Sequence, residues 1–217
     1  MAFPEKMAQH LTYSFIGECL PQKSQKDLER IEYGLAIFFI ALPKFVALLS
    51  AAIFFHFRID KFLVYFAVAL LSYGLVRAYA WGIHLKDDFS CFIGSFILLF
   101  GITFMSIFYV FPWYLILVLW GVSCGLLYCF APAATAARPL RSAVLRKKLR
   151  KKLLAVILLL FIMALMNMGN PYGKLITLGV FWESIFTTPW MYKLFKLKGG
   201  ETNEKEQVVC YTSHHVK

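Results

Sequence analysis

Six long apolar stretches are the strongest constraint on how this chain can fold. They run over residues 33–57, 62–80, 91–110, 113–131, 153–168 and 175–192. A helix that crosses a bilayer needs about 20 mostly apolar residues, because the hydrocarbon core is about 30 Å thick. Charged residues make up 16% of the chain, whereas about 25% is usual for soluble domains. The sequence therefore predicts an all-α polytopic membrane protein with about six transmembrane helices.

The basic residues predict how these helices are oriented. Six spans place both termini on the same side of the membrane, and Lys and Arg mark the cytoplasmic side. Most of the 23 Lys and Arg residues fall in the N-terminal region, the second and fourth connections and the C-terminal tail. We therefore expect a protein of the cell membrane with both termini in the cytoplasm. The net charge of +11 then reflects topology and attraction to anionic lipid rather than nucleic-acid binding.

We expect one domain over residues 1–217 with three parts. Residues 1–32 form cytoplasmic or interfacial helices, residues 33–195 form the six-span core, and residues 196–217 form a flexible cytoplasmic tail. Apolar residues within 7–20 share one helical stripe, which predicts an N-terminal amphipathic helix that lies on the membrane.

The first predicted span has a capped start and a polar residue near its middle. Ser24 is followed three residues later by Asp27, a pattern typical of a capped helix start. Pro43 and Lys44 lie near the middle, where an ammonium group costs at least about 2.5 kcal/mol. In one interpretation the proline breaks the helix and Lys44 snorkels or lines a wet cavity. In the other, Lys44 contacts an acidic group of a substrate.

The fourth connection, residues 131–152, begins with small residues and prolines and ends in a dense basic run. It is either a topology anchor that binds lipid phosphates or a docking surface for an acidic peptide, and the two roles are compatible. Its basic residues are Arg138, Arg141, Arg146, Lys147, Lys148, Arg150, Lys151 and Lys152.

Residues 77–91, RAYAWGIHLKDDFSC, gather polar side chains between the second and third spans. If Asp88 or Ser90 caps the third span, Cys91 lies in the first turn of a helix, where free backbone N–H groups and the helix dipole stabilise a thiolate. His84 can then take the thiol proton and later return it to a leaving group. On residues alone, an interfacial histidine and a packed cysteine explain the pattern equally well.

The spacing of His84 and Cys91 restricts this hypothesis. On one continuous helix, residues seven apart are separated by about 10 Å along the axis, too far for a direct hydrogen bond. The segment between them must therefore bend or unwind, and its aspartates and serine are residues that favour turns and caps.

This stretch resembles the active-site region of the accessory gene regulator B (AgrB) family, membrane peptidases of Gram-positive quorum sensing. Arg77, Gly82, His84 and Cys91 carry the resemblance, with Ser95 following on the same helix. The sequence DLERIEYGL, the six spans and APAATAARPL before the basic run extend it over residues 10–195. Two departures are Trp81, where the family commonly has a second glycine, and the Asp87–Asp88 pair, where a serine is common.

The resemblance implies that Cys91 is the nucleophile of a cysteine endopeptidase on the cytoplasmic side and His84 is its general base and acid. The substrate would be an AgrD-type propeptide, cleaved through an acyl-enzyme and closed into a thiolactone or lactone autoinducing peptide. Asp88 and Ser95 are supporting candidates. Arg77 would steady a carboxylate or an oxyanion, or reach the lipid headgroups, and Gly82 would allow a turn or a close approach of the peptide.

The propeptides of this family have an acidic tail, which the basic connection and Lys44 match in sign. Anionic lipid and a second copy of the chain are the other expected partners. The five cysteines form no zinc pattern, and we expect neither a metal nor a cofactor. The main alternative is a six-helix transporter or channel for a small solute or peptide, which would use Lys44 and Glu183 and need no chemistry at Cys91.

Overall fold

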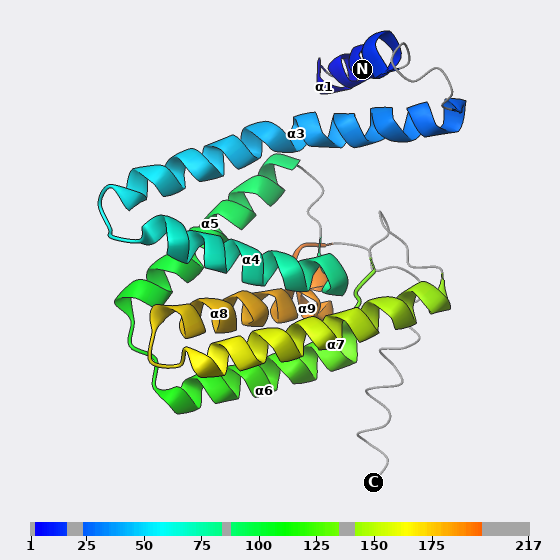
Figure 1. The fold of residues 1–217 in the computed structure, drawn as a ribbon. Helices are drawn as coiled ribbons and strands as arrows, with labels where there is room; N and C mark the ends of the chain where they lie inside the picture. The colour runs from blue at the N-terminus through cyan, green and yellow to red at the C-terminus, as the bar shows by residue number, and fades with distance from the viewer. Residues whose placement is uncertain (1–2, 17–23, 84–87, 135–141, 197–217) are drawn as a thin grey trace. The chain divides into compact units, whose positions relative to one another are not determined.

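The computed structural model describes residues 3–16, 24–83, 88–134 and 142–196, which form helices with no β-strand among them (Figure 1). The chain divides into two compact units, residues 1–59 and 60–217. The predicted all-α architecture is confirmed, and apolar helices in both units make the chain a multi-pass membrane protein.

The first unit contains α1 (Phe3–His10), the π-helix η1 (Leu11–Ile16) and α3 (Gln25–His56). Both α1 and η1 contact α3. Helical structure therefore covers the predicted N-terminal helix as far as Ile16, and residues 17–20 of that prediction lie outside the described part of the chain.

Helix α3 begins where the sequence predicts, after Ser24, and it continues past Pro43, where one interpretation expected a break. Ser24 caps it: the backbone N–H of Asp27 donates to Ser24 Oγ at 3.3 Å, and Ser24 Oγ donates to Asp27 Oδ2 at 2.8 Å. The helix then runs through Pro43 to His56. The interpretation in which Pro43 breaks the helix is therefore wrong, because a proline removes one backbone hydrogen bond while its neighbours can still bond.

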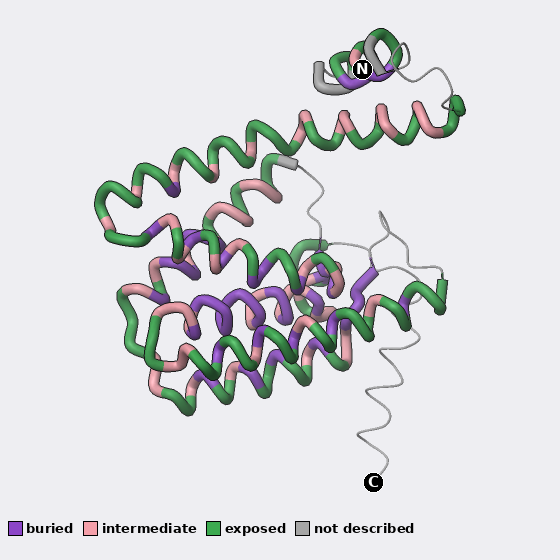
Figure 2. Tube along the Cα trace, in the orientation of Figure 1, coloured by how far each residue is buried: buried purple, intermediate pink, exposed green. Residues whose placement is uncertain are grey.

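The second unit consists of six helices in the described residues. They are α4 (Phe62–Ala80), α5 (Asp88–Phe108), α6 (Trp113–Phe130), α7 (Ala143–Met166), α8 (Pro171–Phe186) and α9 (Pro189–Leu194). Helix α8 contacts α4, α5, α6 and α7, and Figure 2 shows it as the most buried helix. The core of this unit is therefore built around α8.

Close packing of α8 against α4 depends on one glycine. A β-carbon on Gly179 would lie 2.5 Å from Ser72 Oγ and 3.2 Å from the backbone nitrogen of Tyr73. Small residues allow helix backbones to approach closely in membranes, where no hydrophobic force drives helices together. Gly179 therefore sets the distance between α4 and α8.

Four helices in the described residues are long and apolar enough to cross a membrane: α3, α4, residues 89–108 of α5, and α6. Outward-facing side chains on these helices, such as Leu71, Ile97 and Val118, are exposed and apolar, as expected for contact with lipid. The two remaining predicted spans overlap with α7, whose first half is basic, and with α8, which has 16 residues.

Several helix boundaries differ from the predicted spans, and two of the differences have a clear physical cause. The basic run at the end of the fourth connection is helical, because Ser142 caps α7 by accepting from the backbone N–H of Leu145 and Lys, Arg and Leu favour helices. The sixth span does not continue to Tyr192: α8 ends at Phe186 and α9 begins at Pro189. Proline disfavours helical geometry in the residue before it.

Candidate functional site

Cys91 is the fourth residue of α5, and its half-buried thiol takes part in no disulfide. The first four backbone N–H groups of a helix have no partner within the helix and carry the positive end of its dipole. The first turn of α5 is therefore a location that stabilises a thiolate.

Cys91 lines a small pocket of about 80 Å³ in the second unit. The walls come from α4, the segment after α4, α5 and the region around the end of α8. The lining residues are Tyr73, Arg77, Ile83, Cys91, Gly94, Ser95, Leu98, Phe186 and Phe195. Two candidates from the sequence, Arg77 and Ser95, thus share a pocket with Cys91.

The chain leaves α4 through two residues with positive φ angles. Trp81 has φ of +67° and Gly82 has φ of +88°. A β-carbon on Gly82 would also lie 2.9 Å from Glu183 Oε1. Gly82 is therefore required both for its backbone conformation and for the close approach of the Glu183 carboxylate.

Ile83, the last described residue before His84, is held from two sides. Its backbone N–H donates to the Phe186 carbonyl at 3.2 Å. Its carbonyl accepts a hydrogen bond from Arg77 Nη2 at 2.6 Å. This segment is therefore fixed both to α4 and to the end of α8.

The segment around Ala133 supports the turn that follows α4. The backbone N–H of Ala133 donates to the Ala80 carbonyl at 2.9 Å, and Ala133 forms an isolated parallel bridge with Trp81. Ile83 and Ala133 pack with Tyr192 in a small buried cluster.

The most buried charged group at the site is Glu183 on α8, whose side chain is 0% exposed. Arg77 Nη1 lies 3.1 Å from Glu183 Oε2 and 3.2 Å from the Tyr73 hydroxyl. The sequence suggested a substrate carboxylate, an oxyanion or the lipid headgroups as the partner of Arg77. In the structure its guanidinium contacts a carboxylate of the chain itself.

Sequence reasoning did not assign Glu183 to this site, although a signal was present. Glu183 is the only carboxylate within the six predicted spans, and Arg77 is the only arginine within them. Charges inside a membrane protein usually pair with one another. A pairing of these two residues could have been predicted on that basis.

Ser95 lies one turn after Cys91 on α5. Its hydroxyl donates to the Cys91 carbonyl at 2.9 Å, a bond within the helix. Ser95 therefore contacts the backbone of Cys91 in this structure.

The other predicted site residues lie elsewhere or outside the described residues. His84, Asp87, Arg138 and Arg141 belong to ranges 84–87 and 135–141, and the side chain of Asp88 is likewise outside the description. Lys147 and Lys148 are exposed on α7. Lys44 is half-buried on α3 of the first unit.

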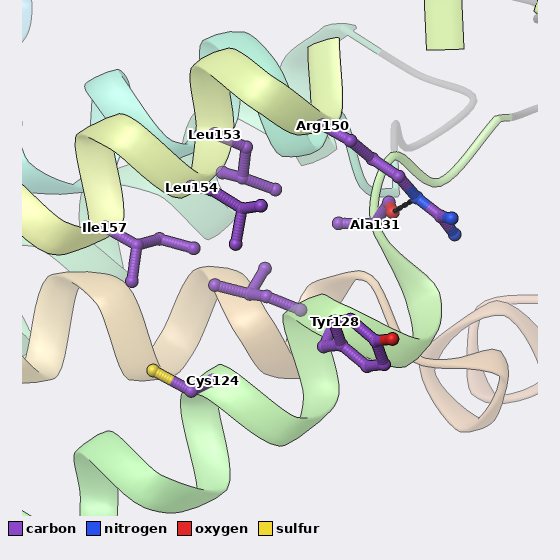
Figure 3. Close-up of a pocket in the computed structure, with 8 residues that line it drawn as sticks. Cys124, Tyr128, Ala131, Arg150, Leu153, Leu154 and Ile157 are labelled. Atoms are coloured by element: carbon purple, nitrogen blue, oxygen red, sulfur yellow. Dashed lines mark hydrogen bonds between the residues drawn. The ribbon is translucent and has the colours of Figure 1, made fainter. Parts of the chain in front are cut away.

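A second pocket, between α6 and α7, contains a different cysteine (Figure 3). Cys124 points into it from α6, and its walls include Tyr128, Leu154 and Ile157. At one end Arg150 Nε donates to the Ala131 carbonyl at 3.0 Å. The described lining offers Cys124 neither an imidazole nor a carboxylate, so this pocket has no acid–base partner for a thiol.

Comparison with known proteins gives matches over most of the chain. The family model described as Accessory gene regulator B matches residues 5–187. An AgrB-like protein of Clostridium acetobutylicum is 27% identical over 183 residues, which cover 84% of this chain and 85% of that protein. Accessory gene regulator protein B of Staphylococcus carnosus is 29% identical over 163 residues, covering 73% of this chain and 82% of its own.

The protein of the same name in Staphylococcus aureus is 25% identical over 194 residues, which cover 86% of this chain and 94% of that protein. No solved structure matches the chain.

Proposed function

Because the chain belongs to the accessory gene regulator B family, we propose that it is a membrane-embedded cysteine endopeptidase that processes an AgrD-type quorum-sensing propeptide. The observation that carries the proposal is the position of Cys91 in the first turn of α5, in the lining of a pocket that also includes Ile83, the residue before His84 in the sequence. The helix start favours the thiolate, and His84 is proposed to supply the base.

In the proposed cleavage step, His84 accepts the proton of the Cys91 thiol, and the thiolate sulfur attacks the scissile carbonyl carbon. The carbon–nitrogen bond then breaks, and His84 returns the proton to the leaving amine. The acidic C-terminal tail of the propeptide departs with a new amino group. The rest of the propeptide remains on Cys91 as a thioester.

In the proposed ring closure, a cysteine or serine side chain of the bound peptide attacks the thioester. The new bond forms a thiolactone or lactone, and the Cys91 thiol is released with a proton. A positioned intramolecular attack can outrun hydrolysis by a large effective molarity. Walls such as Ile83, Leu98 and Phe186 are apolar and would help to keep water from the thioester.

Substrate capture is proposed to depend on charge. Lys147 and Lys148 are exposed on α7, and with Arg138 and Arg141 they would attract the acidic propeptide tail or anionic lipid at the cytoplasmic surface. Lys44 would contact an acidic group of the substrate. The resemblance also suggests a homodimer. Both termini and the active site are proposed to face the cytoplasm.

The transporter alternative receives less support. It needs Glu183 along a solute path, whereas Glu183 is buried and paired with Arg77.

The test is co-expression of the chain with the propeptide encoded nearest to its gene, followed by mass spectrometry of the released tail and of the protein. We expect the wild type to release the tail and to carry an acyl adduct on Cys91. Cys91→Ala and His84→Ala should accumulate in the membrane and release none. Cys124→Ala is the matched control, because that thiol lies in the other pocket. Cleavage by Cys91→Ala at the wild-type rate would disprove the proposal.

A further inference from the structure

Glu183 is a buried carboxylate that the proposed chemistry does not use. Its side chain is 0% exposed, and its contact with Arg77 is an ion pair of 3.1 Å. Removing a carboxylate from water costs several kcal/mol, which a single ion pair often fails to repay. Neutral residues in place of both Arg77 and Glu183 could therefore serve stability about as well, so stability alone does not explain why this pair is charged.

The geometry connects this carboxylate to the pocket wall. Arg77 uses Nη1 to contact Glu183 and Nη2 to donate to the Ile83 carbonyl at 2.6 Å. Because a guanidinium is planar and presents its donors in a fixed fork, fixing one nitrogen orients the other. Glu183 thereby sets the direction of the bond that Arg77 makes to the Ile83 backbone.

Glu183 also touches the turn directly. Its Oε1 lies 2.9 Å from the position that a β-carbon on Gly82 would take. Three residues after Glu183, the Phe186 carbonyl accepts the backbone N–H of Ile83 at 3.2 Å. The end of α8 thus holds Gly82 and Ile83 through one side chain and one backbone group.

We propose that Glu183 is a positioning residue for the cleavage reaction: directly and through Arg77 it fixes the backbone of Gly82 and Ile83, and Ile83 both lines the Cys91 pocket and precedes His84 in the sequence. This inference rests on the proposed function, since it assigns Glu183 a role in that same site. Glu183 would then act on the Cys91 thiol indirectly, through the backbone that precedes His84.

The test measures alkylation of Cys91 by iodoacetamide in membranes without propeptide, read from the Cys91 peptide by mass spectrometry. Glu183→Gln keeps the shape of the side chain and removes its charge. Thr177→Val is the matched control on α8: Thr177 is fully buried and accepts a hydrogen bond from Trp120 Nε1 at 2.9 Å. Thr177→Val therefore also breaks a buried polar pair, that of Thr177 with Trp120, and neither residue lines the Cys91 pocket.

We expect Glu183→Gln to slow alkylation at neutral pH by about 10-fold, because a misplaced catalytic group can cost up to about 100-fold. Thr177→Val should alkylate as the wild type does. The double variant with His84→Ala should be no slower than His84→Ala alone, since both changes remove the same assistance. Wild-type alkylation of Glu183→Gln, or equal slowing by Thr177→Val, would overturn the inference.

Propeptide cleavage separates this inference from the proposed function. If the wild type releases no tail, the proposed function fails while the alkylation result still decides the role of Glu183. If the wild type does release the tail, Glu183→Gln should lower kcat and leave KM within about twofold, because the substrate-binding residues are untouched.

If the Glu183→Gln protein does not accumulate in the membrane, the variant Arg77→Lys is tested in its place. An ammonium group cannot reach Glu183 and the Ile83 carbonyl in the same forked geometry, so wild-type alkylation of that variant would also overturn the inference.

Discussion

Gly82 and Glu183 are in such close contact that a β-carbon on the glycine would lie 2.9 Å from Oε1 of the carboxylate. They are about one hundred residues apart in the sequence, one just after α4 and the other in α8. The contact combines a backbone with φ of +88° and a buried charge. It joins the chain that leads to His84 with the central helix of the second unit.

This contact predicts that Gly82→Ala slows tail release by about 10- to 100-fold and destabilises the fold by about 1–3 kcal/mol. The alanine would occupy a left-handed conformation and displace the carboxylate. Stability is measured by thermal unfolding in detergent, and activity by release of the propeptide tail. Gly74→Ala on α4 is the control, because nothing lies within 4 Å of its β-carbon position. Equal effects of the two substitutions would contradict the prediction.

The sequence predicted the helices well where apolar runs have clear ends. The predicted span over 62–80 coincides with α4, and the span over 113–131 differs from α6 by one residue. Proline and the basic run marked the other boundaries less well, because Pro189 interrupts an apolar stretch and the basic residues are good helix formers. Apolar periodicity therefore identified spans more reliably than it identified their ends.

The candidate site was predicted in part. The motif identified the family and brought attention to Cys91, Arg77 and Gly82. It did not identify Glu183 as the partner of Arg77, because periodicity shows which face of a helix is apolar and not which helices are neighbours. The conformation of Trp81, with φ of +67°, was also beyond the sequence pattern, since a bulky residue rarely adopts it.

Ser95 is predicted to contribute little to the chemistry. Its hydroxyl bonds to the Cys91 carbonyl within α5, and such a bond is worth about 0.5–1.5 kcal/mol. Ser95→Ala should therefore keep tail release within about threefold of wild type, and its α5 should remain folded. The measurement is the rate of tail release at saturating propeptide. Loss of activity as large as that of His84→Ala would indicate a direct role for the hydroxyl instead.

Gly179 is predicted to limit how closely α4 and α8 can pack. Gly179→Ala should cost about 1–3 kcal/mol, the usual range for overpacking, because its β-carbon would lie 2.5 Å from Ser72 Oγ. Adding Ser72→Ala should recover part of this loss, and the two effects should not be additive. Gly125→Ala on α6 is the control, since its β-carbon would meet nothing within 4 Å. Thermal unfolding of Gly179→Ala, Ser72→Ala, the double variant and Gly125→Ala measures the coupling, and additive effects would contradict the contact.

The basic residues on α7 are predicted to act in substrate binding rather than in chemistry. Lys147 and Lys148 are exposed, and neither belongs to the lining of the Cys91 pocket. Replacing both by Glu should raise KM for a propeptide with an acidic tail by about 10-fold at low salt and leave kcat near wild type. The effect should shrink at high salt, because counterions screen charges on the surface. Lys26→Glu, an exposed lysine outside the basic run, is the control for a general charge effect. A KM increase that is independent of salt, or equal in Lys26→Glu, would mean that these lysines do not attract the tail by charge.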